Sequence, residues 1–264
     1  MIGSLLLTAI ILYLGALLFV YLLAERIIFQ PQASSYRDSD RIVKVNLPNG
    51  MSISAIYLSD PNSRYTILYS HGNAEDIGQL LSVLEGIKAA GFSVFAYDYR
   101  GYGTSSGTPS EENTYQDEDA AYEYLVNTLG VASGRIIPLG RSIGGAPAVD
   151  LAYRRQVGGL IIESSFVTAY RVLTRIPLFP FDKLKNISKM KHIVCPVLVI
   201  HGKRDEVIPF WHGEQLFHEA NEPKLSYWVD GAGHNDLYEV AGDGYARALR
   251  DFAAFIEQSN ASGH

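Results

Sequence analysis

A serine flanked by glycines is the first group in this 264-residue sequence that could do chemistry. Residues 140–144 read GRSIG, which has the G-x-S-x-G form of a nucleophile elbow. In such a turn the serine lies between a strand and a helix, its backbone is strained, and the residues two positions away must be small. The pentapeptide follows a short apolar run at 135–139 and precedes a helical pattern at 143–154. We therefore predict that Ser142 is a nucleophile held above one edge of a sheet.

A histidine that could act as the base lies late in the chain. Of the seven histidines, only His234 and the terminal His264 follow the last predicted strand, 225–229. His234 lies in the glycine-rich loop 231–236, GAGHND. Such a loop can place an imidazole over the serine, where it accepts the serine proton and then protonates the leaving group. His234 is therefore the predicted general base.

An aspartate that could orient this imidazole follows an earlier strand-like run. The chain order Ser142, Asp205, His234 is typical of hydrolases with this elbow. Two other carboxylates are alternatives, because Glu163 ends the preceding strand and Glu206 is the neighbour of Asp205. We favour Asp205 because its spacing from the strand end fits best.

Two backbone N–H groups could form an oxyanion hole. Residues 70–73, SHGN, leave a short apolar run, and a chain leaving a strand in this way can point the N–H of Asn73 at the site. The N–H of Ile143, in the first turn after the elbow, would be the second donor. Loss of one such donor typically costs about 3 kcal/mol of transition-state stabilisation. We interpret His71 and His201 as structural residues.

Another glycine-rich loop, 98–105, reads DYRGYGTS. It has neither the G-x-x-x-x-G-K-[ST] pattern nor a G-x-G-x-x-G pattern that opens a helix, so we do not interpret it as a phosphate site. Instead we expect a buried network of Asp98 and Arg100 that holds this turn beside the oxyanion loop.

Alternating strands and helices must position these residues. A hairpin, 41–47 and 52–58 around Pro48-Asn49-Gly50, precedes the alternation. The later predicted strands are 65–70, 92–97, 135–139, 160–163, 196–201 and 225–229, and the predicted helices are 77–90, 117–129, 143–154, 210–220 and 237–258. This pattern predicts an α/β fold, with a mostly parallel sheet that is covered by helices on both faces. Ligands of such sheets bind beyond the carboxyl ends of the strands.

One segment, about 164–193, interrupts the alternation and is predicted to be a lid-like insertion. Its apolar and aromatic side chains are candidates for contact with an apolar substrate. The candidate substrate-binding residues are Phe166, Tyr170, Leu173, Leu178 and Phe179. A lid that packs on the core without touching substrate is the alternative.

The chain begins with an apolar run that contains no charged residue from position 2 to 24. As a helix, these 23 residues would reach about 35 Å, enough to cross a hydrocarbon core of about 30 Å. We predict an uncleaved single transmembrane helix, with an anchor and juxtamembrane segment at 1–30 and a second domain at 31–264, and Pro31 should end the helix. The flanking positive charges all follow the run, which favours a cytoplasmic location for the second domain.

Composition narrows the possible partners. The 22 Lys and Arg residues against 28 Asp and Glu give a net charge of −6, which argues against nucleic-acid binding by a basic surface. A lone cysteine, Cys195, excludes an intramolecular disulfide and a cysteine-rich zinc site. The predicted chemistry uses no metal or cofactor. Its partners would be the substrate and a lipid bilayer.

Taken together, these motifs resemble the Bem-forty-six-like branch of the α/β-hydrolase superfamily, and within it the α/β-hydrolase-domain-seventeen group. The matching stretches are 70–74 (SHGNA), 97–103 (YDYRGYG), 105–111 (SSGTPSE), 142–144 (SIG), 201–208 (HGKRDEVI) and 231–236 (GAGHND). The resemblance implies an α/β-hydrolase fold, with Ser142 as nucleophile, Asp205 as acid and His234 as base. It also implies a membrane-associated serine hydrolase, and that group removes palmitate from cysteines. The group attaches through a lipidated N-terminal cysteine cluster, whereas this chain has an apolar run there.

We therefore expect a membrane-anchored serine hydrolase that cleaves carboxylic esters or thioesters with an apolar acyl group. A peptidase or amidase on the same fold is one alternative. The other is a non-catalytic binding protein that has kept the hydrolase fold.

Overall fold

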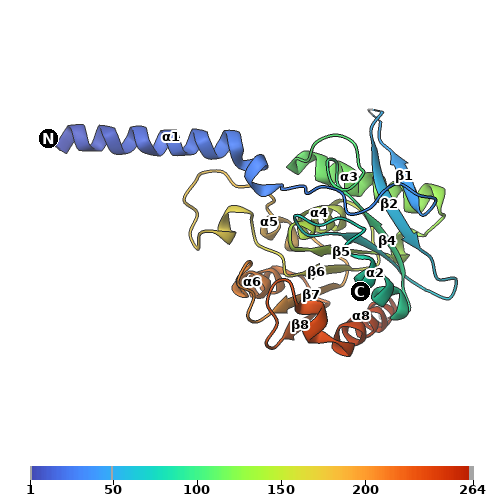
Figure 1. Ribbon diagram of the computed structural model, residues 1–264. Helices are drawn as coiled ribbons and strands as arrows, with labels where there is room; N and C mark the ends of the chain where they lie inside the picture. The colour runs from blue at the N-terminus through green and yellow to red at the C-terminus, as the bar shows by residue number, and fades with distance from the viewer. Residues whose placement is uncertain (1, 49, 262–264) are drawn as a thin grey trace.

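An eight-stranded sheet forms the centre of the computed structural model, which describes residues 2–48 and 50–261 (Figure 1). Its strand order is β1-β2-β4-β3-β5-β6-β7-β8. The strands are β1 (Ile42–Asn46), β2 (Ser52–Leu58), β3 (Thr66–Ser70), β4 (Ser93–Tyr97), β5 (Ile136–Arg141), β6 (Leu160–Glu163), β7 (Val197–Gly202) and β8 (Lys224–Val229). Strand β2 pairs antiparallel with β1 and with β4, and every other pair is parallel. The predicted α/β fold with a mostly parallel sheet is confirmed.

Helices cover both faces of this sheet, and two apolar clusters fill the spaces between helices and strands. One cluster joins Phe95 of the sheet to Val149 of α4 (Gly145–Arg154). The other joins Tyr69 of β3 to Leu84 of α2 (Leu81–Ala89) and to Phe252 of α8 (Asp243–Ala261). Every residue of β3 and of β4 is buried, which explains why these strands are continuous apolar runs in the sequence.

Three predicted helices differ from the structure. Helix α2 begins at Leu81, four residues after the predicted start at 77. Helix α3 (Glu111–Glu123) begins six residues before the predicted start at 117, because the Oγ of Ser110 accepts a hydrogen bond from the N–H of Asn113 and caps it. The predicted helix 237–258 is two helices, α7 (Leu237–Ala241) and α8. The break is at Gly242, whose φ of +50° lies in the left-handed region.

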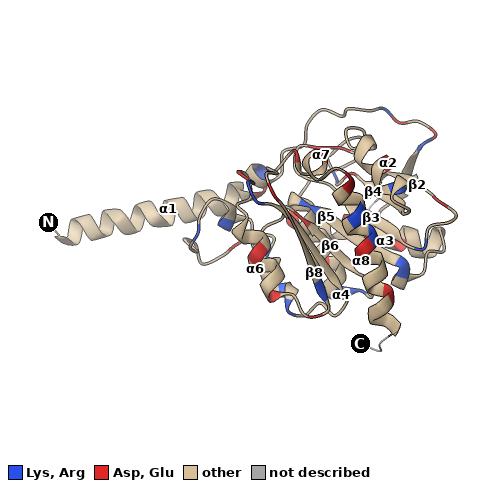
Figure 2. Cartoon of the chain, turned by 90° about the horizontal axis from the view of Figure 1, so that it is seen from below, with Lys and Arg blue, Asp and Glu red and all other residues tan. Residues whose placement is uncertain are grey.

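Helix α1 (Ile2–Ile28) projects away from the rest of the molecule (Figure 1). It is long and apolar enough to cross a membrane, and no part of its most apolar window is buried. In Figure 2 the ribbon of α1 is coloured for charged residues only at the end that meets the body. The helix ends before Pro31, as predicted. Phe29 then enters the core with 4% of its surface exposed, whereas Ile27 is 51% exposed.

The 164–193 segment is mostly irregular and lies beside α1. It contains only a short 3₁₀ turn, η4 (Tyr170–Val172), and α5 (Ile187–Met190). After this segment and β7 comes α6 (Trp211–Glu219). The hydroxyl of Tyr13 in α1 donates to the carbonyl of Leu178 at 3.0 Å, and the rings of Tyr21 and Phe181 meet edge to face at 5.9 Å. The segment therefore follows α1 outward from the body.

Candidate active site

The turn from β5 into α4 holds Ser142 in a strained conformation. Ser142 has φ of +53°, in the left-handed region that a residue with a side chain rarely occupies. A Cβ on Gly140 would collide with the carbonyl of Gly144, and a Cβ on Gly144 would collide with the carbonyl of Ser70 at the end of β3. The two glycines are therefore required by close backbone contact, as the pentapeptide predicts.

The structure brings Ser142, His234 and Asp205 together from three loops at the carboxyl ends of the strands. The Nε2 of His234 lies 3.1 Å from the Oγ of Ser142, although 92 positions separate the two residues. The Nδ1 of His234 lies 2.8 Å from Oδ2 of Asp205. All three side chains are buried. In this arrangement the serine hydroxyl donates to Nε2 while Nδ1–H donates to the carboxylate, which fixes the tautomer of the ring.

The surroundings of Asp205 favour its charged form. Burial by itself raises the pKa of Asp205, but hydrogen bonds from His201 and His234 and the charge of His234 outweigh burial and hold this pKa well below its ordinary value. The N–H groups of Val207 and Ile208 also donate to Oδ1, at 3.0 and 2.7 Å. A carboxylate that stays ionised can stabilise a positive charge on the imidazole.

The two alternative carboxylates lie in other contacts. Glu163 accepts a hydrogen bond from the hydroxyl of Tyr245 at 2.5 Å and lies 3.4 Å from Nε of Arg141. Glu206 is exposed, and within the described part of the chain it forms no hydrogen bond or ion pair with His234. The geometry therefore favours Asp205 over Glu163 and Glu206.

The loop that follows β3 lies against the elbow. A Cβ on Gly72 would approach Nη1 of Arg141, next to Ser142 in the chain. Within residues 2–48 and 50–261, no backbone acceptor is found for the N–H of Asn73, so this donor is available to a ligand. The N–H of Ile143 is in the first turn that leads into α4, where N–H groups have no partner within the helix. Asn73 and Ile143 thus remain the candidate oxyanion donors.

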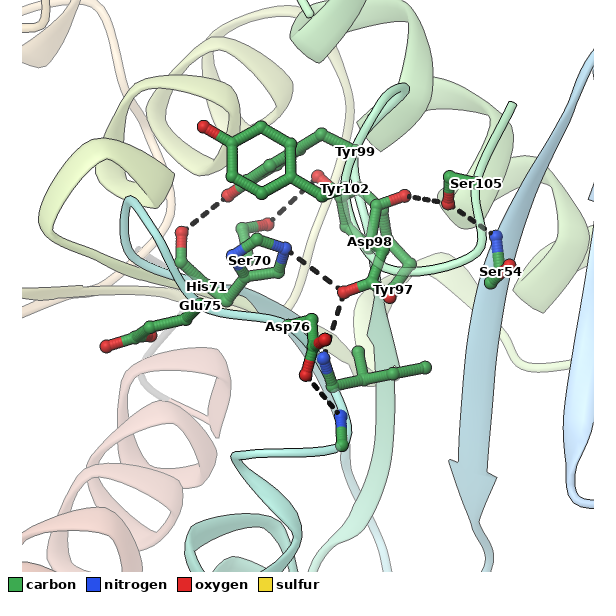
Figure 3. A network of polar contacts seen from close by, with 12 residues as sticks. Ser54, Ser70, His71, Glu75, Asp76, Tyr97, Asp98, Tyr99, Tyr102 and Ser105 are labelled. Carbon is green, nitrogen blue, oxygen red and sulfur yellow. Dashed lines mark hydrogen bonds and ion pairs between the residues drawn. The ribbon is translucent and has the colours of Figure 1, made fainter. Parts of the chain in front are cut away.

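A buried polar network supports the loop that follows β3 (Figure 3). His71 is fully buried, with Nε2 3.3 Å from Oδ1 of Asp98, while the hydroxyl of Tyr99 donates to the carbonyl of His71 at 2.7 Å. Burial lowers the pKa of His71, but the hydrogen bond with Asp98 and its charge outweigh burial, so this pKa is raised. His71 is structural, as predicted. His201 is likewise fully buried, and its Nε2 lies 2.9 Å from the carbonyl of Ile208.

Asp98 and Arg100 are both buried in polar networks, but they do not pair with each other. The N–H of Ile77 and the hydroxyl of Tyr36 donate to the carboxylate of Asp98. Arg100 instead forms a buried ion pair with Asp117 of α3, with Nε 2.6 Å from Oδ1. The N–H of Arg100 also donates to Oδ2 of Asp117 at 2.8 Å, so this one carboxylate holds both the backbone and the side chain of Arg100.

Sequence reasoning missed Arg141, the residue before the serine. Its guanidinium contacts Glu75 of the oxyanion loop and donates to the carbonyl of His234 at 3.0 Å. It also donates to Oδ1 of Asn235 at 3.3 Å. Arg141 therefore joins three loops: the serine loop, which carries Ser142, the oxyanion loop, which follows β3, and the histidine loop, which carries His234. The G-x-S-x-G pattern leaves this position unspecified, so the pattern gave no signal for this role.

The five predicted substrate-binding residues are dispersed. Phe166 is buried in the core, beside Ser165, whose Oγ donates to the carbonyl of Ser142 at 2.7 Å. Tyr170 and Phe179 pack edge to face at 6.0 Å between ring centres. These three residues therefore belong to packed parts of the structure.

Leu173 and Leu178 face solvent. Leu173 is 86% exposed and Leu178 is 48% exposed. The structure does not bring them together with Phe166, so the five residues do not line one common pocket. A cavity of about 310 Å³ lies beside His234, between Arg141, Tyr238 and α2, and its lining contains none of the five.

Comparison with known proteins agrees with this fold. A family model described as "Serine aminopeptidase, S33" matches residues 61–179. An esterase of Pyrococcus furiosus has a TM-score of 0.71 at 17% identity, over 85% of this chain and 96% of that chain. A monoacylglycerol lipase of Paleococcus ferrophilus has a TM-score of 0.61 at 21% identity, over 78% of this chain and 98% of that chain. The fold is that of the α/β hydrolases.

Sequence similarity identifies the family within this class. The chain is 40% identical over 234 residues to alpha/beta hydrolase domain-containing protein 17B of Xenopus tropicalis, covering 87% of this chain and 80% of that protein. It is 39% identical over 236 residues to the 17B protein of Homo sapiens, covering 88% of this chain and 81% of that protein. The chain belongs to the family of alpha/beta hydrolase domain-containing 17 proteins.

Proposed function

We propose that this α/β hydrolase is a membrane-anchored serine hydrolase that cleaves carboxylic esters or thioesters with an apolar acyl group. The single observation that carries the proposal is the hydrogen-bonded chain from Ser142 through His234 to Asp205, with distances of 3.1 and 2.8 Å. A serine hydroxyl is a weak nucleophile unless an adjacent base accepts its proton, and the chain supplies that base together with a carboxylate to orient it.

The reaction follows from these contacts. The Oγ of Ser142 attacks the acyl carbonyl as its proton passes to Nε2 of His234, and the N–H groups of Asn73 and Ile143 stabilise the resulting oxyanion. His234 then protonates the departing alcohol or thiol, which leaves an acyl group on Ser142. Water, activated by the same imidazole, attacks this ester and releases the carboxylic acid and the free serine. None of these steps uses a metal or a cofactor.

The position of the 164–193 segment supports an apolar acyl group taken from a bilayer. Tyr13, which contacts the carbonyl of Leu178, lies twelve residues before Glu25, and this is about 18 Å along a helix. If α1 spans a bilayer, Leu178, whose side chain is exposed, lies at the depth of lipid tails. We propose that the bilayer is a partner of both α1 and this segment, and that the remaining domain faces the cytoplasm, since the flanking positive charges follow α1.

Labelling with a fluorophosphonate tests the serine mechanism. The full-length protein in detergent micelles should be labelled on one serine, and Ser142→Ala should abolish the label. Ser165→Ala is the matched control, because this hydroxyl contacts the carbonyl of Ser142 but, across residues 2–48 and 50–261, forms no hydrogen bond with a histidine or a carboxylate. Folded wild-type protein that stays unlabelled would favour the non-catalytic binding protein.

The substrate class is tested by a chain-length series of acyl esters and acyl thioesters in bilayers. Turnover should rise with the length of the acyl chain. Turnover that does not change with the length of the acyl chain would contradict the proposal that the acyl group is apolar.

A peptidase is the second candidate, because the matching family model is described as a serine aminopeptidase. An amide has a poorer leaving group than an ester, so its hydrolysis requires efficient protonation of the departing nitrogen. Comparing aminoacyl p-nitroanilides with p-nitrophenyl esters separates the two candidates. Faster turnover of the anilides at equal concentration would favour the peptidase.

A further inference from the structure

The chain that leaves α1 is held by the side chain of a candidate oxyanion residue. The Nδ2 of Asn73 donates to the carbonyl of Ile28 at 2.7 Å, and the N–H of Gln30 donates to Oδ1 of Asn73 at 3.0 Å. These two bonds lie on either side of Phe29, whose ring is buried in the core. One carboxamide therefore fixes the point at which the apolar helix joins the domain.

The same carboxamide also holds the loop that carries it. Its Oδ1 accepts a hydrogen bond from the N–H of Ala74 at 3.0 Å and one from the hydroxyl of Tyr102 at 2.7 Å. Tyr102 in turn accepts a bond from the N–H of Gln30 at 3.0 Å. Ala74 has φ of +59°, a conformation that persists in a residue with a side chain only where the surroundings impose it. Contacts to residues 28–30 are part of those surroundings.

The direction of the Asn73 N–H depends on this arrangement. The backbone N–H and the side-chain carboxamide belong to one residue, so a carboxamide that is fixed on three sides also restricts the rotation of the peptide unit before it. Oxyanion stabilisation requires a donor that is fixed in position before the reaction, because a displacement of one ångström costs much of its effect. Release of residues 28–30 would remove two of the bonds that fix the carboxamide.

We propose that the side chain of Asn73 is a positioning residue that couples the docking of α1 to the oxyanion hole. Full turnover then requires the segment 28–30 to be seated on the domain, and a displaced anchor lowers kcat while the serine, histidine and aspartate remain in place. This proposal rests on the serine hydrolase function proposed above.

A double-mutant cycle on the full-length protein in detergent micelles tests the coupling, with p-nitrophenyl acetate as a short substrate. Asn73→Ala removes the carboxamide. Gln30→Pro leaves Asn73 unchanged but removes the backbone N–H that donates to Oδ1 of Asn73. We expect kcat to fall about 10-fold to 100-fold in Asn73→Ala, with KM changed less than about two-fold. Gln30→Pro should lower kcat in the same direction, and the double variant should be no slower than Asn73→Ala, because both changes break one shared contact.

A matched control separates positioning from stability. Asn221 also donates through Nδ2 to two backbone carbonyls, those of Lys191 and Ile193, at 2.8 and 2.9 Å, at the opposite end of the sheet from Ser142. Asn221→Ala should lower Tm and leave kcat unchanged. If Asn73→Ala does not fold, Tyr102→Phe replaces it in the cycle, since it removes one hydroxyl and keeps the ring.

The outcomes are distinct. Unchanged kcat in folded Asn73→Ala, or fully additive losses in the double variant, would overturn the coupling. Wild-type protein that neither hydrolyses the ester nor reacts with fluorophosphonate would instead overturn the proposed function.

Discussion

Glu118 of α3 carries a buried carboxyl group that lies against Ser70, the last residue of β3. The oxyanion loop begins at the next residue, His71. It contacts the hydroxyls of Ser70 and Tyr97 through Oε2, while Oε1 has no partner among the described residues. Burial raises its pKa from 4.5 to about 8, against the opposing effect of these hydrogen bonds. We therefore predict that Glu118 is protonated at neutral pH in the folded protein.

The sign and size of the effect on stability follow from this pKa. The folded state keeps the proton at a pH where the unfolded state has lost it, so the free energy of unfolding falls as pH rises from about 4.5 to about 8. Each pKa unit corresponds to about 1.4 kcal/mol, which gives a loss of about 5 kcal/mol over this range. Glu118→Gln mimics the protonated acid and should remove this loss.

Urea unfolding followed by tryptophan fluorescence in detergent micelles measures the effect. At pH 4.5 Glu118→Gln and wild type should have similar stability, and by pH 8 the variant should be more stable by several kcal/mol, up to about 5. Glu112→Gln, on the exposed face of the same helix, is the control and should keep the wild-type slope. A difference between Glu118→Gln and wild type that stays constant from pH 4.5 to pH 8 would refute the reasoning.

Four further predictions concern the site and its surroundings. Asp205→Asn should fold and lower kcat about 10⁴-fold, since the ring loses the partner that fixes its tautomer; a loss below ten-fold in an ester assay would count against its role. Arg141→Gln should lower kcat on a short ester about 10-fold to 100-fold with KM unchanged. An equal loss of kcat in a variant that lowers Tm by the same amount but lies far from the site would show that the role of Arg141 is purely structural. Leu178→Asp should slow hydrolysis of long-chain esters in bilayers and spare p-nitrophenyl acetate; equal effects on both would contradict lipid contact. Burial raises the pKa of Cys195 to about 12, so iodoacetamide at pH 8 should leave the folded protein unmodified in mass spectrometry, and rapid alkylation would contradict this.

The central strands could be predicted because they are buried on both faces. The run predicted at 160–163 is β6 without any change of bounds, and 65–70 differs from β3 by one residue. The early start of α3 was missed because its first turns are polar and contain no apolar stripe, although the capping serine was visible in the sequence. The break at Gly242 was missed because a single glycine is tolerated within a helical pattern.

The candidate site could be predicted in part for a similar reason. Strand ends of a parallel sheet meet at one edge, so a serine, an aspartate and a histidine that each follow a strand are expected to converge there. The contacts of Arg141 and Asn73 could not be predicted in this way. Arg141 reaches a carbonyl 93 positions away, and Asn73 reaches one 45 positions away. Such contacts depend on the conformations of two loops at once, and sequence periodicity does not encode them.

These unpredicted contacts explain how loops can hold reacting groups in place. Loops are more mobile than the strands they follow, whereas catalysis requires placement to within about 0.5 Å. The guanidinium of Arg141 joins the serine, oxyanion and histidine loops, and the carboxamide of Asn73 joins the oxyanion loop to the end of α1. The sheet brings the loops to one edge, but cross-links between them set the distances at which the groups meet. Variants of Arg141 and Asn73 should therefore change kcat more than variants of equally buried side chains elsewhere in the fold.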